Sequence, residues 1–356
     1  AWFTYETLKR ITQQHPEHQF LFIFDRPYSD AFIFADNIQP VVAHPQSRHP
    51  ALWYLFFEYG IPKVLKKHNP DLFLSPDGWL SLSTPVKSMA VIHDLNFEKH
   101  PEFIPWTVRK YYHYFFPRFA RRADRIATVS EFTKKDIAER YQVPGSKIDV
   151  VYNGANENYK PVSREVVMKT RERYTSGCPY FVFVGTIHPR KNLTNLFKAF
   201  GAFKKRSSND VKLLIVGDKK WWTGDIREAY DNLDCKEDVV FGGRMSSDDL
   251  HKAIASALAM TYVSFFEGFG IPIVESFYCH VPVITSDVTS MPEVAGDAAL
   301  LVDPFSVESI TEAMVRIASD EKLRTDLIEK GKKRMARFSW QQSADRLWES
   351  IEKTMD

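Results

Sequence analysis

Short apolar runs alternate with longer amphipathic segments through the second half of the chain, and this alternation limits the fold more than any other feature. The runs are rich in β-branched and aromatic residues and occupy residues 180–186 (YFVFVGT), 211–218 (VKLLIVGD), 238–245 (DVVFGGRM), 259–266 (AMTYVSFF) and 281–287 (VPVITSD). Such runs, separated by helix-length segments, are typical of parallel βαβ units. We therefore predict an α/β, doubly wound sheet here, followed by helical patterns nearly to the end of the chain.

The first half repeats the alternation less regularly. Its strand candidates are residues 19–25 (QFLFIFD), 71–77 (DLFLSPD), 87–94 (KSMAVIHD), 124–130 (DRIATVS) and 147–154 (KIDVVYNG). Residues 151–162 are rich in turn residues and lack periodicity, so we expect them to link two domains, as the chain length also suggests. Residues 2–15 read as a helix with no strand before it, and we expect the first strand of this domain to be missing from the sequence.

The composition is that of an ordinary globular protein, with 44% hydrophobic and 26% charged residues. A formal net charge of +2 gives no overall attraction to nucleic acid, so we expect no nucleic-acid partner. Cys178, Cys235 and Cys279 lie far apart, which argues against a disulfide framework and a zinc site and fits a reducing cytoplasm. No apolar run reaches the roughly 18 residues of a membrane span.

The stretch from Arg109 to Arg125 alternates aromatic rings with cations. One interpretation is a helix that lies on a membrane surface. The other is a helix that buries its rings and solvates its basic residues. We favour the second interpretation, because aromatic stripes usually belong to a core.

Residues 265–276 (FFEGFGIPIVES) place a glutamate, two glycines and a proline close together, with a second glutamate after them. Glu267 comes just after a predicted strand, at the edge of an open α/β sheet where ligands bind. Gly268 and Gly270 allow close approach of the backbone, and proline suits the first helical position. We therefore expect a helix to begin near Ile271, with Glu275 on its first turn and its N–H groups facing a ligand.

Two carboxylates suit the hydroxyl groups of a sugar, and backbone donors at the start of a helix suit an anion. A ligand that is both polyol and phosphate is a nucleotide sugar. The alternative is a plain glycine-rich turn in which Glu275 is an ordinary first-turn acid, and the motif alone leaves both readings open.

Residues 184–192 (VGTIHPRKN) form a second candidate turn. Gly185 ends a predicted strand, and Arg190 and Lys191 stand just before the next helix. Two cations there would neutralise a diphosphate leaving group, whereas the alternative is a pair of solvated surface cations. The first reading is favoured because both turns belong to the carboxyl edge of one predicted sheet.

Residues 91–97 (VIHDLNF) place His93 and Asp94 after an apolar strand of the first domain. We expect both side chains to face an interdomain cleft. A structural and a functional role remain open for His93, since loops at that edge of a sheet often carry function.

Taken together, these segments resemble the retaining glycosyltransferase family 4 (glycosyl transferases group 1), which has the GT-B fold. The resemblance runs from about His93 to the end and is carried by the E-x7-E pair Glu267 and Glu275, VGTIHPRKN, HDL with TVSEFTKKDI, VVYNGAN, SMPEVAGDAALLVDP and RFSWQQSADRLWESI. It implies two Rossmann-like doubly wound domains that face each other across a cleft. The acceptor-binding domain would span 1–158, the nucleotide-sugar donor domain 159–337, and a helix over 338–356 would cross back to the first domain.

The resemblance also implies roles for individual residues. Arg190 and Lys191 would hold the donor diphosphate, Glu275 would bind the ribose, and His93 would lie near the transferred sugar on the acceptor side. The hydroxyl groups of that sugar would be bound by Glu267. The backbone of the two turns would complete the donor site, at Gly185, Gly268, Phe269, Gly270 and Ile271. Thr186 stands where the family often has arginine, so we expect Arg190 to supply that charge and Lys191 to be the more critical cation.

The activity implied is retaining transfer of a hexose, with mannose slightly favoured, to a saccharide or lipid-linked saccharide during cell-surface polysaccharide or lipopolysaccharide synthesis. The donor would be GDP-mannose or a UDP-sugar, with no cofactor, and no DxD-type triplet stands at a strand end, so we predict metal independence. We expect a cytoplasmic enzyme in peripheral contact with the inner membrane. The alternatives are a nucleotide-sugar-binding protein without turnover, and a GT-B phosphorylase or epimerase.

Overall fold

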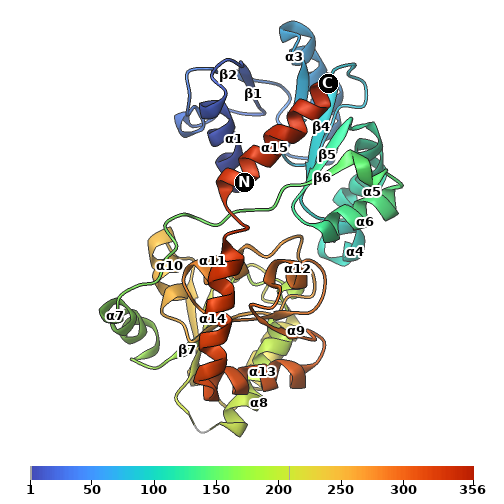
Figure 1. The fold of residues 1–356 in the computed structure, drawn as a ribbon. Helices are drawn as coiled ribbons and strands as arrows, with labels where there is room; N and C mark the ends of the chain where they lie inside the picture. Colours follow the sequence, from blue (N-terminus) through green and yellow to red (C-terminus); the bar gives the residue numbers. More distant parts are fainter. Residues whose placement is uncertain (1, 208) are drawn as a thin grey trace. The chain divides into compact units, whose positions relative to one another are not determined.

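The computed structural model describes residues 2–207 and 209–356 and divides the chain into two compact units. The first consists of the chain up to Gly154 together with Trp340–Asp356, and the second is Ala155–Ser339 (Figure 1). These divisions fall at 154/155 and 339/340, where the sequence suggested 158/159 and 337/338.

The second unit contains a six-stranded sheet in the order β12-β11-β10-β7-β8-β9, and all neighbouring strands are parallel. The strands are β7 (Tyr180–Val184), β8 (Lys212–Val216), β9 (Val239–Gly243), β10 (Ala259–Tyr262), β11 (Val283–Ser286) and β12 (Leu300–Val302). From β7 the chain builds outward through β8 and β9, and it then returns to place β10 on the other side of β7. The sheet is therefore doubly wound, as predicted, and its topological switch point lies between β7 and β10.

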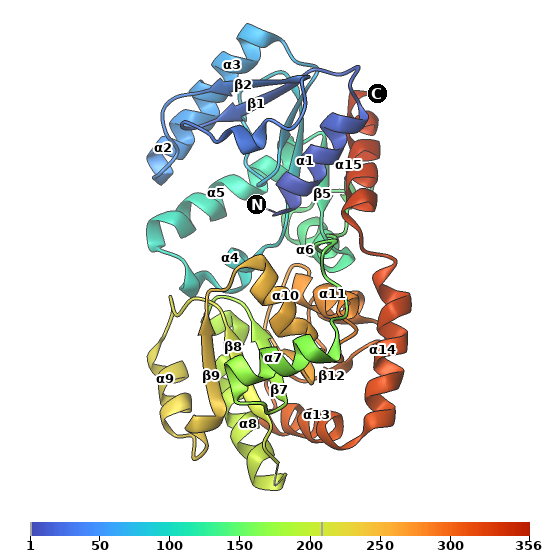
Figure 2. The same cartoon turned by 90° about the vertical axis from the view of Figure 1, so that its left-hand side faces the viewer.

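Figure 2 shows the helices of the second unit around its sheet. They are α7 (Arg164–Thr175), α8 (Leu193–Arg206), α9 (Gly224–Asp231), α10 (Ser247–Ala255), α11 (Ile271–Tyr278), α12 (Met291–Ala295), α13 (Val307–Ser319) and α14 (Glu321–Met335). Helix α8 shows why they form: its apolar residues recur at helical spacing, and Leu196, Phe200 and Phe203 are all fully buried. Lysine and arginine fill its last turn, where cations favour the helix dipole.

The first unit has a four-stranded parallel sheet in the order β3-β4-β5-β6 and a separate parallel pair, β1-β2. The strands are β1 (Phe20–Phe24), β2 (Ile38–Val42), β3 (Leu72–Ser75), β4 (Lys87–Ile92), β5 (Arg125–Thr128) and β6 (Ile148–Val150). Its helices are α1 (Trp2–Gln14), α2 (Pro50–Leu55), α3 (Ile61–His68), α4 (Asn96–Lys99), α5 (Trp106–Arg122), α6 (Glu131–Tyr141) and α15 (Trp340–Met355). A single π-helical turn, Phe56–Gly60, joins α2 to α3.

Two strands were not anticipated from the sequence. Strand β2 contains Pro40, which lacks an N–H group and weakens a strand signal, and it pairs only with β1. Strand β12 has three residues and forms the edge of its sheet, so the prediction of only helical patterns beyond residue 287 was wrong there.

Helix α15 belongs to the first unit although it comes from the end of the sequence. Its Leu347 and Ile351 are buried, and the ring of Trp348 stacks on His15, the residue after α1, at 3.7 Å between centroids. The Oγ of Ser350 donates a hydrogen bond to Asp149 at 2.5 Å. The C-terminal helix predicted over 338–356 is thus an integral part of the first unit.

Among the described residues, none of the helices combines the length and the apolar character needed to cross a membrane.

Candidate functional site

Two segments of the second unit meet where the strand order reverses. One leaves β7 at Gly185, and the other leaves β10 at Val263. The N–H of Phe265 donates to the carbonyl of Arg190 at 2.9 Å, and the Nδ2 of Asn192 donates to the carbonyl of Val263 at 2.9 Å. The two turns that the sequence singled out are therefore fastened together at a switch point, which is where ligands bind in open α/β sheets.

The segments bring together four side chains, which we call the cation–carboxylate cluster: Arg190, Lys191, Tyr262 and Glu267. Arg190 Nη1 lies 2.8 Å from one carboxylate oxygen of Glu267, and Lys191 Nζ lies 2.6 Å from the other. Lys191 Nζ also donates to the hydroxyl of Tyr262 at 2.6 Å. The side chains of Arg190 and Lys191 are only 20% and 14% exposed, so the alternative of two solvated surface cations is wrong.

The charges of the cluster do not cancel. Burial would raise the pKa of Glu267, but Lys191 and Arg190 outweigh burial and lower that pKa to about 2. Glu267 is therefore an anion at neutral pH. Two cations and one carboxylate leave one net positive charge in a largely buried place, and such a place attracts an anionic ligand.

Glycine is required at the base of the first turn. Gly217, at the end of β8, has a φ of +148°, and a Cβ placed on it would lie 2.0 Å from the carbonyl oxygen of Gly185. No other residue fits there without moving the turn that carries Arg190 and Lys191. The predicted Gly185 is itself in this contact, and its N–H donates to the carbonyl of Val216 at 2.9 Å.

The turn after Glu267 is fixed by hydrogen bonds to its backbone carbonyl oxygens. Ser290 Oγ donates to the carbonyl of Glu267 at 2.8 Å and to that of Phe269 at 3.1 Å. Gly268, Phe269 and Gly270 are all buried, and Gly270 takes a left-handed φ of +105° directly before α11. Helix α11 then begins at Ile271, as the sequence predicted.

Glu275 does not lie on the first turn of α11, and that prediction was wrong. The helix begins at Ile271 and has no acidic residue in its first turn, because one turn covers fewer than four residues. The carboxyl of Glu275 instead shares a hydrogen bond with the hydroxyl of Tyr159. Burial raises the pKa of Glu275 to about 7, although the Tyr159 bond acts in the opposite direction.

His93 belongs to the first unit, whereas the other predicted site residues belong to the second. It follows β4, as predicted, and its Nε2 lies 3.0 Å from the carbonyl oxygen of Pro76. The ring of Phe3 meets the His93 ring edge-on at 5.2 Å. Burial lowers the pKa of His93, which favours the uncharged ring, and Nε2 donates because its partner is a carbonyl oxygen. The neighbouring Asp94 accepts the N–H of Asn96 at 2.8 Å, which closes the loop.

Sequence reasoning missed Tyr262, Tyr159 and Ser290. Tyr262 lies in a predicted strand, where an aromatic residue carries no functional signal, and Tyr159 lies in the predicted linker. Ser290 lies in the segment SMPEVAGDAALLVDP, which carried the family resemblance but gave it no individual role. Each joins the site through tertiary contacts that no local pattern reveals.

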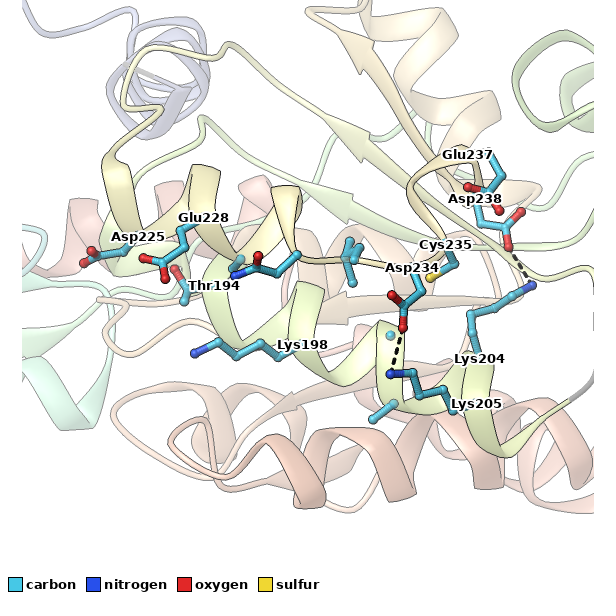
Figure 3. A pocket seen from close by; sticks show the side chains of 15 residues that line it. Thr194, Lys198, Lys204, Lys205, Asp225, Glu228, Asp234, Cys235, Glu237 and Asp238 are labelled. Atoms are coloured by element: carbon cyan, nitrogen blue, oxygen red, sulfur yellow. Dashed lines mark ion pairs between the residues drawn. The ribbon is translucent and has the colours of Figure 1, made fainter.

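The second unit also has a cavity of about 810 Å³ between α8 and α9, and no predicted site residue lines it (Figure 3). Two ion pairs lie in its lining: Lys205 with Asp234 at 2.8 Å, and Lys204 with Asp238 at 2.8 Å. Its lining holds three lysines against five acidic residues, so it does not suit a diphosphate. Within 2–207 and 209–356, histidine, cysteine and acidic side chains form no group of three or more that could hold a metal ion.

Two family models match the chain. The model described as glycosyl transferases group 1 matches residues 169–334, and the model described as glycosyltransferase family 4 matches residues 3–159. Together they cover most of both units, and helix α15 lies beyond them.

Curated relatives and solved structures agree with these matches. O-antigen chain mannosyltransferase B of Escherichia coli is 28% identical over 256 residues, which is 72% of this chain and 67% of the relative. O-antigen chain mannosyltransferase RfbU of Salmonella typhimurium is 27% identical over 288 residues, 81% of this chain and 76% of the relative. The structure of Anabaena HepE in complex with UDP and glucose matches with a TM-score of 0.76 and 16% identity, covering 98% of this chain and 96% of HepE. That likeness confirms the predicted fold of two Rossmann-like domains.

Proposed function

Because the chain belongs to glycosyltransferase family 4 and has the GT-B fold, we propose that it is a retaining hexosyltransferase. The donor in this proposal is a nucleotide-diphosphate sugar. The acceptor is a saccharide or a lipid-linked saccharide in the synthesis of a cell-surface polysaccharide.

The observation that carries the proposal is the cation–carboxylate cluster at the switch point between β7 and β10. Arg190 and Lys191 would donate hydrogen bonds to the donor diphosphate, whose two phosphates need more positive charge than one lysine supplies. Glu267 would then turn from its cationic partners toward the hydroxyl groups of the transferred sugar. The buried turn from Gly268 to Gly270 would lie against the same sugar.

The names of the relatives favour a mannose donor. Two of them are O-antigen chain mannosyltransferases, so GDP-mannose is the first donor to test, and the UDP complex of HepE makes UDP-sugars the second. The charge that a diphosphate leaving group develops would be met by Arg190, Lys191 and the positive end of α11. On this basis we propose transfer without a metal ion or a cofactor.

A retaining reaction needs no carboxylate nucleophile in this proposal. The leaving phosphate would help to remove the proton of the acceptor hydroxyl on the same face of the sugar. The role of the protein would be to stabilise the charge on the diphosphate and on an oxocarbenium-like sugar. His93, held through Nε2, would lie on the acceptor side of that sugar.

The cytoplasm, at the inner face of the membrane, is the location that we propose. The three cysteines are free, and free cysteines are typical of a reducing compartment. A lipid-linked acceptor would bring the enzyme into peripheral contact with the membrane.

The first experiment is the thermal stability of the purified chain with GDP, UDP, ADP and their sugars, with and without EDTA. We expect one nucleotide to raise the melting temperature and EDTA to leave the shift unchanged. The matched pair of variants is Lys191→Ala and Lys198→Ala, because Lys198 lines the cavity of Figure 3 rather than the cluster. Only Lys191→Ala should lose the shift.

Transfer is then measured with the nucleotide sugar that shifts the melting temperature. The configuration of the new bond, read by NMR of the product, should be the same as that of the donor. Nucleotide binding without transfer to any saccharide or lipid-linked acceptor would favour a nucleotide-sugar-binding protein. An inverted product would contradict the retaining mechanism.

A further inference from the structure

The two cations of the cation–carboxylate cluster share Glu267, and each also has a second partner in the protein. Arg190 Nη1 donates to the backbone carbonyl of Phe266 at 2.6 Å, besides its bond to Glu267. Lys191 Nζ donates to the hydroxyl of Tyr262 at 2.6 Å, besides its bond to the other carboxylate oxygen. The second partner of Arg190 belongs to the backbone, whereas that of Lys191 is the tip of a side chain. A substitution at Tyr262 can therefore remove it.

The side chain of Tyr262 has a fixed position. Tyr262 is the last residue of β10 and is only 2% exposed. Strand β10 is paired on both sides, with β7 and with β11, and the Oγ1 of Thr285 on β11 donates to the carbonyl of Tyr262 at 2.8 Å. A hydroxyl group on such a strand stays in one place, whereas the long side chain of a lysine has many rotamers. Tyr262 can therefore restrict the motion of Lys191.

The Tyr262 hydroxyl is suited to accept a hydrogen bond from an ammonium group. Burial and, after it, the negative charge of Glu267 raise the pKa of Tyr262 well above its ordinary value. The hydroxyl stays neutral as a result, and its oxygen accepts from Lys191. Lys191 Nζ also lies over the Tyr262 ring, 4.7 Å from its centroid, where a cation is attracted to the ring. The hydroxyl and the ring thus both attract the ammonium group.

We propose that Tyr262 is a positioning residue whose hydroxyl keeps the Lys191 ammonium group in place for the donor diphosphate after Glu267 has turned toward the sugar. This role deepens the proposed function, on which it rests for the diphosphate. When Glu267 leaves its cationic partners, the bond of Lys191 to Tyr262 remains. Because a misplacement of about 1 Å can lower a rate about 100-fold, a fixed ammonium group favours turnover.

The alternative is that Tyr262 only fills space in the core, and Tyr180 provides the comparison. Tyr180 is the first residue of β7 and is fully buried, and its hydroxyl donates to the carbonyl of Ala253 at 2.6 Å. Strands β7 and β10 are parallel, so the first residue of one and the last residue of the other lie at opposite ends of the sheet. Tyr180→Phe and Tyr262→Phe each remove one buried hydroxyl group, but only Tyr262→Phe removes a partner of Lys191.

The first test uses the full chain without a ligand. NMR relaxation of the Lys191 side-chain carbons reports the motion of this residue, and Lys191→Met identifies its signals. We expect Lys191 to stay ordered in Tyr262→Phe and in Glu267→Ala, because one partner remains in each, and to become mobile in the double variant. If Glu267→Ala does not fold, Glu267→Gln replaces it. Equal mobility of Lys191 in the Glu267 variant and in the double variant would show that Tyr262 does not hold it, and would overturn the proposal.

The second test is the kinetics of transfer from GDP-mannose, or from the UDP-sugar that raises the melting temperature. Tyr262→Phe should lower kcat about tenfold and change the donor KM less than about twofold, because the charge that Lys191 meets grows in the transition state. Tyr180→Phe should keep both constants within about twofold of the wild type, since it lies outside the cluster. Equal kcat values for the two variants would mean that the Tyr262 hydroxyl only contributes to packing, which contradicts the proposal.

The two tests separate the role of Tyr262 from the proposed function. If Lys191 becomes mobile only in the double variant and no nucleotide sugar binds, Tyr262 holds Lys191 and only the proposed function fails. If transfer proceeds and Lys191 is equally mobile in the Glu267 variant and in the double variant, the proposed function stands and the role of Tyr262 fails.

Discussion

The two glutamates of one short motif, Glu267 and Glu275, have pKa values shifted in opposite directions. Glu267 comes just after β10 and lies between Arg190 and Lys191, which lower its pKa to about 2. Glu275 lies within α11, and the side chain that bonds it is the neutral Tyr159, so burial raises its pKa to about 7. Burial disfavours the charged form of both glutamates, and nearby cations decide which of them stays ionised.

Because of this difference in pKa, the two glutamates are in different ionisation states near neutral pH. Glu267 is a permanent anion that balances two cations and accepts hydrogen bonds. Glu275 exchanges a proton near neutral pH, so it both donates and accepts hydrogen bonds in the range where enzymes work.

Glu267→Gln should give the largest loss of stability. It removes the carboxylate that bonds both Arg190 and Lys191, and loss of one partner of a buried ion pair lowers the free energy of unfolding by about 3 kcal/mol at neutral pH. In the wild type, the stability that ionised Glu267 contributes should disappear as the pH falls from about 4.5 to about 2. In this range the unfolded chain binds a proton at Glu267, and the folded protein does not bind it until about pH 2. Urea denaturation at several pH values measures both effects. If Glu275→Gln lowered the free energy of unfolding at neutral pH as much as Glu267→Gln does, the two glutamates would not differ as proposed.

Lys191→Met should remove much of the difference between the two glutamates. The pKa of Glu267 should rise toward that of Glu275, because the strongest cationic influence is lost. Turnover should fall about 100-fold, as is typical when one donor to a developing negative charge is removed. NMR titration of the carboxyl carbons and steady-state kinetics are the measurements. Lys198→Met is the control, and a shift in the Glu267 pKa there would mean that the effect is not local.

Glu275→Gln should stabilise the protein in alkaline solution and have little effect in acid. The pKa of Glu275 is higher in the folded state than its usual 4.5, so the wild type loses stability as the pH rises from about 4.5 to about 7. The substituted amide side chain cannot ionise, and the variant should be more stable by about 3 kcal/mol at about pH 8. Thermal unfolding of both proteins across this range measures the difference. A gain of equal size in acid would show that packing, not ionisation, is responsible.

Tyr159→Phe should give the smallest effect. It removes the hydrogen bond that lowers the pKa of Glu275, so that pKa should rise further above its usual value. The stability change should be about 0.5 kcal/mol, the lower end of what a hydrogen bond contributes. The same NMR titration detects the rise, with Tyr174→Phe on α7 as a distant control. An unchanged titration would mean that Tyr159 does not bond Glu275 in solution.

The sequence predicted the parts of the site that follow from local pattern. Strand ends, the start of α11 and the two turns could be identified, because period-two and period-3.6 patterns and glycine or proline positions are local signals. That both turns share one sheet edge followed from parallel strands. The placement of Arg190, Lys191 and Glu267 on one edge was therefore within reach of the sequence.

The strand order could not be predicted from the sequence, and neither could the contacts that depend on it. The Lys191–Tyr262 bond joins residues 71 positions apart, and it exists because β10 returns to lie beside β7. Tyr159 meets Glu275 from a segment without periodicity. The rings of α5 are buried on one face, as the favoured interpretation required, but Trp106 is 64% exposed. A sequence of alternating rings and cations does not tell which face meets the core.

Helix α15 imposes an order of events on a newly made chain. The second unit is one continuous stretch, Ala155–Ser339, so it can complete its fold while synthesis is still under way. The first unit begins earlier, yet the place beside α1 that Trp348 and Leu347 fill stays empty until residues 340–356 have left the ribosome. The part of the molecule that is made first is therefore finished last.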